Sequence, residues 1–211
     1  MDWSFIVASA SALFLVMDPP GNAPLVQGLL QKVAPKRRMS ILVREMCIVL
    51  GLLFLFYFLG DEILSGLGLS KESLSLTGGI MLFLIAVGMV FPSAASHEAH
   101  AHSHEDEPFI VPVAMPLIVG PAAISLVMMQ AAMASNEGKT SEGIMAMLLA
   151  WAASALILCF SGKLLSYLGE KGTVALTRLM GTILVMIAVQ MVLNGITAYL
   201  HYLQSLNVIP Q

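Results

Sequence analysis

The chain has 211 residues, of which 58% are hydrophobic and 11% are charged, and its mean hydropathy is +0.87. A soluble globular protein of this size needs far more polar surface, so the composition excludes that class and indicates an integral membrane protein. The net charge of −3 says little by itself, because in a membrane protein the placement of Lys and Arg matters more than their sum. We expect a lipid bilayer as the main partner and no nucleic acid.

The first predicted span, residues 3–33, contains an acid, three prolines, a glycine and an asparagine between Asp18 and Pro24. Proline lacks a backbone N–H and clashes with the preceding turn. A membrane interior tolerates such a break only where the freed backbone groups are buried in protein or face a watery cavity. We therefore expect a broken helix that marks a functional site. Asn22 is the predicted N-cap of a half-helix that begins at Ala23, with Pro24 in its first turn.

Asp18 supplies the negative charge of this break. An unpaired carboxylate at membrane depth is costly and is usually kept for a function, such as holding a substrate ammonium, binding a coupling cation or carrying a proton. The structural alternative is that Asp18 caps the break and bonds only to backbone. We favour the functional role, with Gly21 and Asn22 as further substrate-binding residues.

The second predicted span covers residues 39–59 and carries Arg44 and Glu45 near its first turns. Neighbouring residues point about 100° apart on a helix, so we expect that these two side chains do not pair with each other. An ion pair between Glu45 and Arg178 from another helix is the predicted alternative. A structural role is favoured over transport for both residues of the second span.

The third predicted span, residues 73–96, is followed by a segment rich in histidine and acid, residues 97–107. Imidazoles and carboxylates in such number can bind Zn²⁺, Ni²⁺ or Cu²⁺, but the same composition is typical of a solvated linker. We favour the linker, because no fixed spacing resembles a defined metal site. The candidate metal ligands are His97, His100, His102 and His104.

The fourth predicted span, residues 109–136, begins with a second break at Pro116, Gly120 and Pro121. Gly120 is the predicted N-cap of another half-helix, with Pro121 in its first turn. The N-terminus of a helix presents unpaired N–H groups and about half a positive charge. Each break is therefore a candidate site for a carboxylate, and these three residues join the predicted substrate-binding set.

The fifth and sixth predicted spans cover residues 143–162 and 179–200, so the chain crosses the bilayer six times and leaves no soluble domain. Each uncharged run is long enough for a hydrocarbon core of roughly 30 Å. Gln190 and Asn194 on the sixth span are predicted either to hydrogen-bond to another helix or to line a pore.

The basic residues fix a predicted orientation. With six spans, eight of the ten Lys and Arg residues fall on one side of the membrane, and only Lys71 and Lys139 fall on the other. The positive-inside rule makes the basic side cytoplasmic. Both termini are then predicted to be periplasmic and residues 97–107 cytoplasmic. We expect a multi-pass protein of the bacterial inner membrane.

The two halves of the chain repeat each other. Residues 79–90 align without gaps with residues 181–192 and share seven of twelve positions, and the two breaks lie at nearly the same offset. Because each half has three spans, its copy enters the membrane from the opposite side, as in secondary transporters with paired discontinuous helices. The predicted fold is an all-α membrane protein whose six helices form two inverted three-helix repeats, residues 1–96 and 108–211, with helices one and four broken.

Several motifs together resemble the MarC family of bacterial inner-membrane proteins, especially its YhgN-type members. The resemblance covers nearly the whole chain, and it implies a six-span protein of the LysE transporter superfamily, in which some members are described as carriers of small neutral amino acids. The motifs are Met17-Asp-Pro-Pro-Gly-Asn-Ala-Pro24, Pro35-Lys-Arg-Arg38, Val43-Arg-Glu45, Gly78-Gly-Ile80, Glu107-Pro-Phe-Ile-Val-Pro112, Pro116-Leu-Ile-Val-Gly-Pro121 and Gly169-Glu-Lys-Gly172 followed by Arg178-Leu-Met-Gly181.

Two functions follow as hypotheses. The first is a secondary carrier for a small neutral amino acid, with the half-helices on its carboxylate and Asp18 on its ammonium or on a coupling cation such as H⁺. The second is a divalent-metal exporter that loads cations through the histidine-rich segment. An enzyme is not expected, because no nucleophile–base spacing, phosphate-binding loop or cofactor motif occurs. No cofactor is predicted, and the small residues in the spans are compatible with a homo-oligomer.

Overall fold

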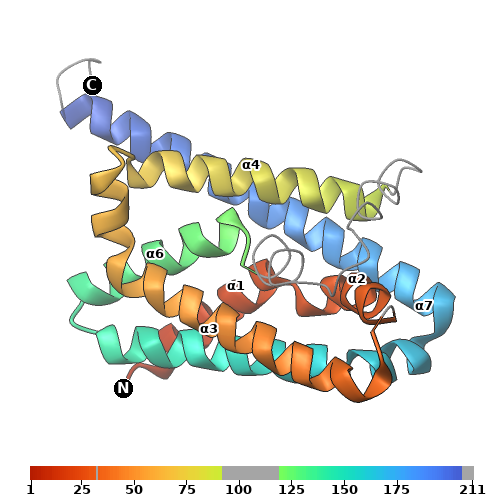
Figure 1. Cartoon of the computed structure of the whole chain (residues 1–211). Helices are drawn as coiled ribbons and strands as arrows, with labels where there is room; N and C mark the ends of the chain where they lie inside the picture. Colours follow the sequence, from red (N-terminus) through yellow and green to blue (C-terminus); the bar gives the residue numbers. More distant parts are fainter. Residues whose placement is uncertain (32, 92–118, 206–211) are drawn as a thin grey trace.

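A computed structural model of the chain describes residues 1–31, 33–91 and 119–205. Every regular element in these ranges is an α-helix. The helices are α1 (Trp3–Met17), α2 (Pro19–Gln31), α3 (Pro35–Gly66), α4 (Lys71–Val90), α6 (Pro121–Asn136) and α7 (Thr140–Ser205) (Figure 1). The prediction of an all-α membrane protein is confirmed.

Four helices are long and apolar enough to cross a membrane, and α6 covers residues 121–136 of the fourth predicted span, whose first part lies outside the described residues. The first predicted span is divided into α1 and α2 at Asp18, so the predicted break is confirmed. The fifth and sixth predicted spans are joined in α7, which bends back at Gly169, where φ is 66° and ψ is 179°. The start of α1 and the end of α7 consequently lie at the same end of the molecule (Figure 1).

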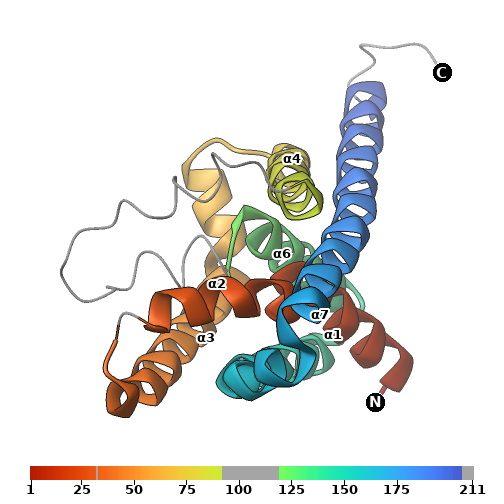
Figure 2. The same ribbon diagram turned by 90° about the vertical axis from the view of Figure 1, so that its right-hand side faces the viewer.

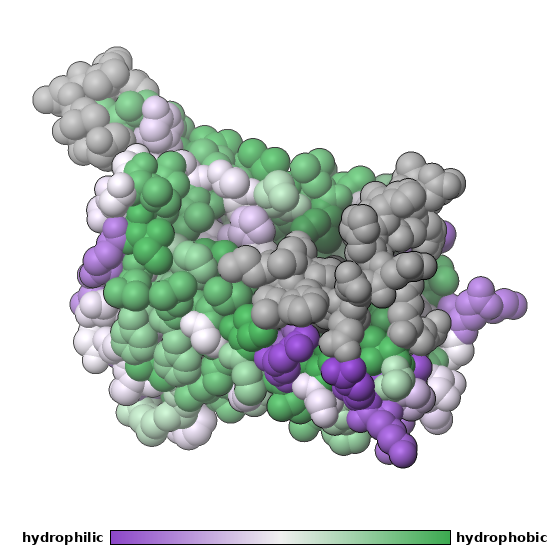
Figure 3. All heavy atoms as spheres, viewed as in Figure 1, coloured by the Kyte–Doolittle hydropathy of each residue, from purple (hydrophilic) through white to green (hydrophobic). Residues whose placement is uncertain are grey.

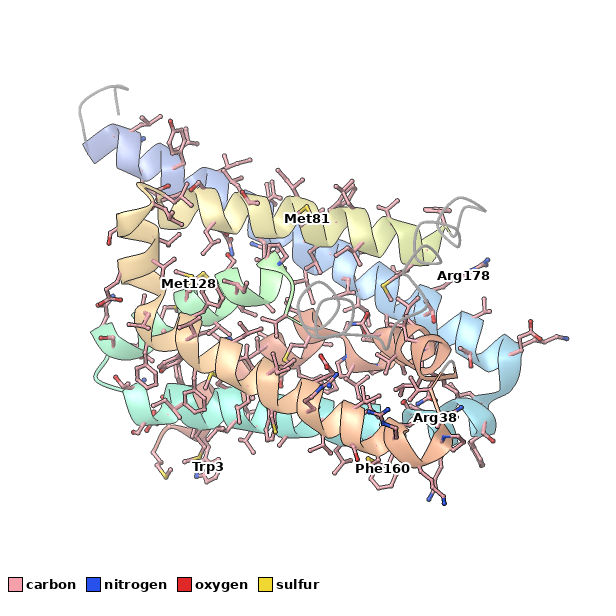
Figure 4. The ribbon with its side chains drawn as sticks, viewed as in Figure 1. Trp3, Arg38, Met81, Met128, Phe160 and Arg178 are labelled. Carbon is pink, nitrogen blue, oxygen red and sulfur yellow. The ribbon has the colours of Figure 1, made fainter. Side chains whose placement is uncertain are left out.

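The surface is divided along the long direction of the helices. Apolar side chains cover the middle of the face shown in Figure 3, and hydrophilic residues gather toward its two ends. Arg38 and Arg178 lie toward the end opposite Trp3 (Figure 4). Exposed apolar side chains such as Leu84, Leu156 and Met186 lie on the helices that cross the middle. In water such an apolar surface would favour aggregation, whereas in a bilayer it matches the hydrocarbon region.

Polar side chains connect the helices at membrane depth by bonding to backbone or to one another. Helices in lipid gain little from the hydrophobic effect between them, so close packing and hydrogen bonds of about 0.6–2 kcal/mol each contribute more. These bonds run from Gln27 to Ser161 Oγ (2.7 Å), from Gln130 to the Ser9 carbonyl (2.9 Å), from Trp151 to the Met46 carbonyl (2.8 Å) and from Ser75 to the Met191 carbonyl (3.1 Å).

At the end that carries the termini, ionic contacts connect the start of α1 to the turn between α6 and α7. The Asp2 N–H donates to Glu142 Oε1 at 2.8 Å, and Lys139 Nζ lies 3.1 Å from Asp2 Oδ2. The N–H of Phe5, and then the Lys139 ammonium, hold the pKa of Asp2 below its usual value. These contacts join the first and second halves of the chain outside the apolar region.

The helix α4 and the second part of α7 pack closely through glycines. A Cβ added at Gly79 would lie 3.0 Å from the Ala188 carbonyl oxygen, and one added at Gly181 would lie 3.0 Å from the Ala86 carbonyl oxygen. Ala86 follows Gly79 at the same distance in sequence as Ala188 follows Gly181. The contacts are thus reciprocal between the two aligned segments, and the inverted repeat stays a prediction.

Candidate functional site

The break in the first span is built around Asp18. Asp18 ends α1 in the left-handed conformation, with φ 43° and ψ 57°, which non-glycine residues adopt rarely. Its N–H still donates to the Phe14 carbonyl at 3.0 Å. Its side-chain Oδ1 accepts the N–H of Gly21 at 3.1 Å, and its carbonyl accepts the N–H of Asn22 at 3.0 Å. One residue therefore caps the end of α1 and the start of α2.

The half-helix starts one turn earlier than predicted, so the assignment of Asn22 as its N-cap is wrong. Pro19 and Pro20 occupy the first two positions of α2, where a helix has no use for an N–H and a φ near −65° is already suitable. The first available donor is the N–H of Gly21, which Asp18 accepts. Asn22 instead lies inside the helix, and its side-chain amide donates to the Met17 carbonyl at 3.0 Å.

Gly21 holds the carboxylate in a tight space. A Cβ at Gly21 would lie 2.0 Å from Asp18 Oδ2 and 2.5 Å from Met89 Cε, so no other residue fits without a shift. Asp18 is 2% exposed, and Oδ2 has no hydrogen-bond partner among the described residues. The bonds that the carboxylate makes are to backbone, as the structural interpretation predicts, and one oxygen remains unsatisfied.

The second half-helix begins as predicted, with Gly120 as N-cap and Pro121 in the first turn of α6. Gly120 is extended, with φ −71° and ψ 171°, and it provides no side chain to cap the helix. The N–H of Ile124 bonds to the Gly120 carbonyl at 3.1 Å. Within the described ranges, the buried N–H groups of Ala122 and Ala123 have no partner.

The two half-helix starts differ in one respect that matters for binding. Pro19 and Pro121 stand the same number of residues apart as Gly79 and Gly181, so Asp18 corresponds to Gly120 in the proposed repeat. The Asn22 and Ile124 N–H groups bond alike, each to the carbonyl of the residue before its half-helix. The difference is at the preceding donor: the Gly21 N–H of α2 is taken by the Asp18 carboxylate, whereas the equivalent Ala123 N–H of α6 has no partner among the described residues. The predicted carboxylate site at the start of α2 is therefore already filled by the protein itself.

The helix α4 contacts the first turns of both half-helices. A Cβ on Gly78 would lie 3.1 Å from Ala122 Cα and 3.2 Å from the Pro121 carbonyl oxygen, while Met89 reaches Gly21. Figures 1 and 2 both place the start of α6 close to the junction of α1 and α2, in the middle of the molecule. Val119 and Met17, which precede the two half-helices, belong to one buried apolar cluster.

Arg44 and Glu45 form an ion pair, which corrects the expectation that they would not. Arg44 Nη2 lies 3.0 Å and Nε 3.2 Å from Glu45 Oε1. The arginine stem is long enough to bend sideways around the helix, so the 100° between neighbouring residues is no barrier. Arg178 is exposed, and the predicted pair between Glu45 and Arg178 is absent from the described structure.

Gln190 and Asn194 bond to each other rather than to another helix. Gln190 Nε2 donates to Asn194 Oδ1 at 2.8 Å, one turn apart on α7, and both residues are exposed. The predicted hydrogen bond between helices is therefore not the one they make. Their part in lining a pore stays a prediction.

Other predicted residues lie outside the described residues. These are Pro116 of the second break and the candidate metal ligands His97, His100, His102 and His104. In the part of the chain that the structure describes, no three His, Cys, Asp or Glu side chains gather as metal ligands. The metal hypothesis thus rests on composition alone.

A cavity of about 200 Å³ lies between α3, α6 and the start of α7, away from the two breaks. Sequence reasoning did not find it, because its lining comes from three separate helices. The open donors of Ala122 and Ala123 were also missed, although the glycine at the N-cap position could have indicated them. The cavity is lined by Phe56, Tyr57, Phe58, Glu62, Met128, Ala131, Ala132, Ser135 and Thr140.

Comparison with known proteins finds similarity over nearly the whole chain. Residues 3–200 match the family described as MarC family integral membrane protein. The UPF0056 inner membrane protein YhgN of Escherichia coli K12 is 45% identical over 195 residues, which cover 92% of this chain and 98% of that protein. A UPF0056 membrane protein of Methanocaldococcus jannaschii is 34% identical over 203 residues, which cover 93% of this chain and 98% of that protein. No solved structure matches.

Proposed function

The chain belongs to the MarC family of integral membrane proteins, and from that premise we propose that it is an inner-membrane secondary transporter of small neutral amino acids such as glycine and alanine. The name of the E. coli relative describes an inner membrane protein, and the apolar helices agree with several membrane passes. Transport, its substrate and its coupling are our proposal. Catalysis forms no part of it.

The observation that carries the proposal is the difference between the two half-helix starts. In α2 the carboxylate of Asp18 accepts the N–H of Gly21. In α6 the residue at the corresponding position is the buried Ala123, and its N–H has no partner among the described residues. The N-terminus of α2 binds a carboxylate, that of Asp18. A carboxylate from the substrate is therefore the ligand that suits the N-terminus of α6.

The ammonium group of the same substrate suits the remaining oxygen of Asp18. A buried carboxylate oxygen without a partner is costly, and a substrate cation compensates it. A zwitterion carries a carboxylate and an ammonium group in one molecule, so it matches an N–H donor and a carboxylate acceptor. A small neutral amino acid can therefore bind the Ala123 N–H with its carboxylate and Asp18 with its ammonium group, and no further charged residue is needed.

Replacement of Gly120 by Asp tests the open donors directly. The new carboxylate would reach the N–H of Ala123 as Asp18 reaches that of Gly21, and it would occupy the substrate's place. We expect Gly120→Asp to abolish uptake of radiolabelled alanine into proteoliposomes. The extended conformation of Gly120 accepts a side chain, so Gly120→Ala is the matched control and should retain most uptake.

Replacement of Asp18 by Asn tests the charge. Asn is as good an N-cap as Asp and tolerates the left-handed conformation, so α2 should still form. We expect alanine uptake to fall by at least about tenfold, equivalent to about 1.4 kcal/mol of lost binding. Wild-type proteoliposomes that take up neither alanine nor glycine, or equal uptake by the Asp18→Asn protein, would disprove the proposal.

A further inference from the structure

Glu45 is the most completely buried charged residue of the described structure, with an exposure of 0%. Its Oε1 accepts two hydrogen bonds from the Arg44 guanidinium, at 3.0 and 3.2 Å. Its Oε2 has no partner in the described ranges. Arg44 keeps 46% of its side chain exposed, so the pair joins a fully enclosed acid to a cation at the protein surface.

Within the described ranges, Glu45 forms an ion pair with one cation, Arg44. The helices α3, α6 and α7 pack on one another, and α6 carries no titratable side chain, nor do α1 and α2. The titratable groups of α7 before Gly169, other than Tyr167, are Glu142, Cys159 and Lys163. Glu142 bonds to Asp2 at the far end, and Lys163 lies over the exposed Phe160 ring. Asp18 ends α1, and the other titratable groups of α3 are Lys36, Arg37, Arg38, Cys47, Tyr57, Asp61 and Glu62. Among the described residues, the ion pair of Glu45 is the one with Arg44, at 3.0 Å.

The pair stands inside the membrane-spanning part of α3. Nine residues separate Arg44 from Pro35, which places the pair roughly 14 Å along the helix from its basic start. At that depth the charged form of an acid with one unsatisfied oxygen has a high free-energy cost. Addition of a proton removes the charge. The guanidinium is then free to turn toward the headgroups on its flexible stem.

We propose that Glu45 is the proton-binding site that couples transport to the proton gradient, with Arg44 as its counter-ion. A proton from water adds to Oε2, the carboxylate becomes a neutral acid, and the Arg44 pair opens. Release of the proton restores the carboxylate and the pair. This inference rests on the proposed function and assigns the coupling proton to Glu45 rather than to Asp18.

Asp18 is less suited to carry this proton. Its Oδ1 accepts the N–H of Gly21 and holds the start of α2, and its Oδ2 is the oxygen that the proposed function assigns to the substrate ammonium. Glu45 lies in the interior of a continuous helix, where its charge caps nothing. The structure therefore separates the residue that shapes the break from the residue that exchanges a proton.

Infrared spectroscopy of the purified protein tests proton binding without any substrate. In lipid, wild-type protein titrated from high to low pH should gain a carbonyl band of a buried, protonated carboxyl group. We expect Glu45→Gln to lose that band, and Glu62→Gln, an exposed acid on the same helix, to keep it. A band of equal size in the Glu45→Gln protein would overturn the assignment.

Alanine flux in proteoliposomes provides the functional test. Glu45→Gln should lose the accumulation that a pH gradient drives, down to the level of pH-equilibrated vesicles, and its alanine exchange should no longer vary with pH. Wild-type accumulation in that variant contradicts the inference and leaves the proposed function standing. If wild-type protein moves no alanine in either assay, the proposed function fails, and the infrared band alone decides whether Glu45 binds a proton.

Should Glu45→Gln fail to fold, Arg44→Gln provides a second variant with Glu45 intact. Loss of the counter-ion removes the two hydrogen bonds that Oε1 accepts, so the infrared band should appear at a different point in the titration. A titration unchanged from wild type shows that Arg44 is not the counter-ion and overturns that part of the proposal. Retention of a single symmetric peak in size-exclusion chromatography checks the fold of each variant.

Discussion

At the scale of single residues, the molecule concentrates its unusual chemistry in Asp18. A left-handed backbone costs a non-glycine residue roughly 1–2 kcal/mol, and burial leaves one carboxylate oxygen unsatisfied. Asp18 stabilises two helix ends. Its N–H caps the C-terminus of α1, and its side chain caps the N-terminus of α2. Gly21 makes room for this arrangement, since its missing Cβ is the space that the carboxylate fills.

The same substitution at two glycines of α2 should therefore have opposite effects. Gly21→Ala forces its methyl group into Asp18 and Met89 and should lower the free energy of unfolding by about 1–3 kcal/mol. Gly28→Ala meets no atom within 4 Å and should raise it by roughly 0.5–1 kcal/mol through helix propensity. Thermal unfolding in detergent measures both. A stabilised Gly21→Ala protein would show that the carboxylate is not held as described.

At the scale of elements, α4 and the second part of α7 form a pair that the proposed repeat relates by symmetry. Gly79 contacts the backbone at Ala188, and Gly181 contacts the backbone at Ala86. Because a backbone carbonyl cannot turn aside as a flexible side chain can, both positions require glycine for helix contact. The pair also touches both breaks, through Gly78 at α6 and Met89 at α2.

Replacement of Gly79 or Gly181 by alanine should lower the free energy of unfolding to a similar degree. We expect Gly79→Ala and Gly181→Ala each to cost about 1–3 kcal/mol, since each methyl group would enter the facing backbone. Gly88 lies on the same helix α4 with nothing within 4 Å, so Gly88→Ala is the control and should be neutral or stabilising. Unfolding midpoints that differ strongly between the first two variants would contradict the reciprocal packing.

At the scale of the whole molecule, charge distinguishes the two ends. One end carries the start of α3 with Lys36, Arg37 and Arg38, and the bend of α7 with Lys171. The other end carries the start of α1, the end of α7 and the contacts of Asp2 with Lys139 and Glu142. By the positive-inside rule we propose that the basic end faces the cytoplasm.

Labelling of single cysteines tests this orientation. In a background with Cys47 and Cys159 replaced by Ala, Leu67→Cys lies exposed in the turn after α3 and Lys171→Cys lies exposed at the bend of α7. A membrane-impermeant maleimide should label Leu67→Cys in spheroplasts and Lys171→Cys only in inverted vesicles. The reverse pattern would place the termini in the cytoplasm and reject the orientation.

The sequence predicts the location of the breaks better than their geometry. Composition and uncharged runs are sufficient for the all-α membrane fold and for a division near Asp18. The wrong cap assignment came from treating Pro19 and Pro20 as the interruption, whereas two prolines without N–H groups are suitable for the first turn of a helix. Which residue accepts the first free N–H depends on a left-handed turn that no local propensity indicates for Asp18.

Side-chain reach explains the other differences. The angle between neighbouring helix positions describes Cβ directions, and the long stem of Arg44 overcomes it. Gln190 and Asn194 are four residues apart, a spacing that lets them satisfy each other, so no second helix is required. The open donors of α6 follow from an absent side chain at Gly120, which a search for polar residues overlooks.

Trp151 gives the protein an optical reporter next to its most buried acid. Its indole N–H donates at 2.8 Å to the carbonyl of Met46, the residue after Glu45. The sequence has two tryptophans, and Trp3 lies toward the opposite end of the molecule from Arg38 (Figure 4). In a Trp3→Phe protein, all tryptophan fluorescence therefore comes from the contact between α3 and α7. Emission wavelength and lifetime then follow any movement of that contact in real time, without an attached dye.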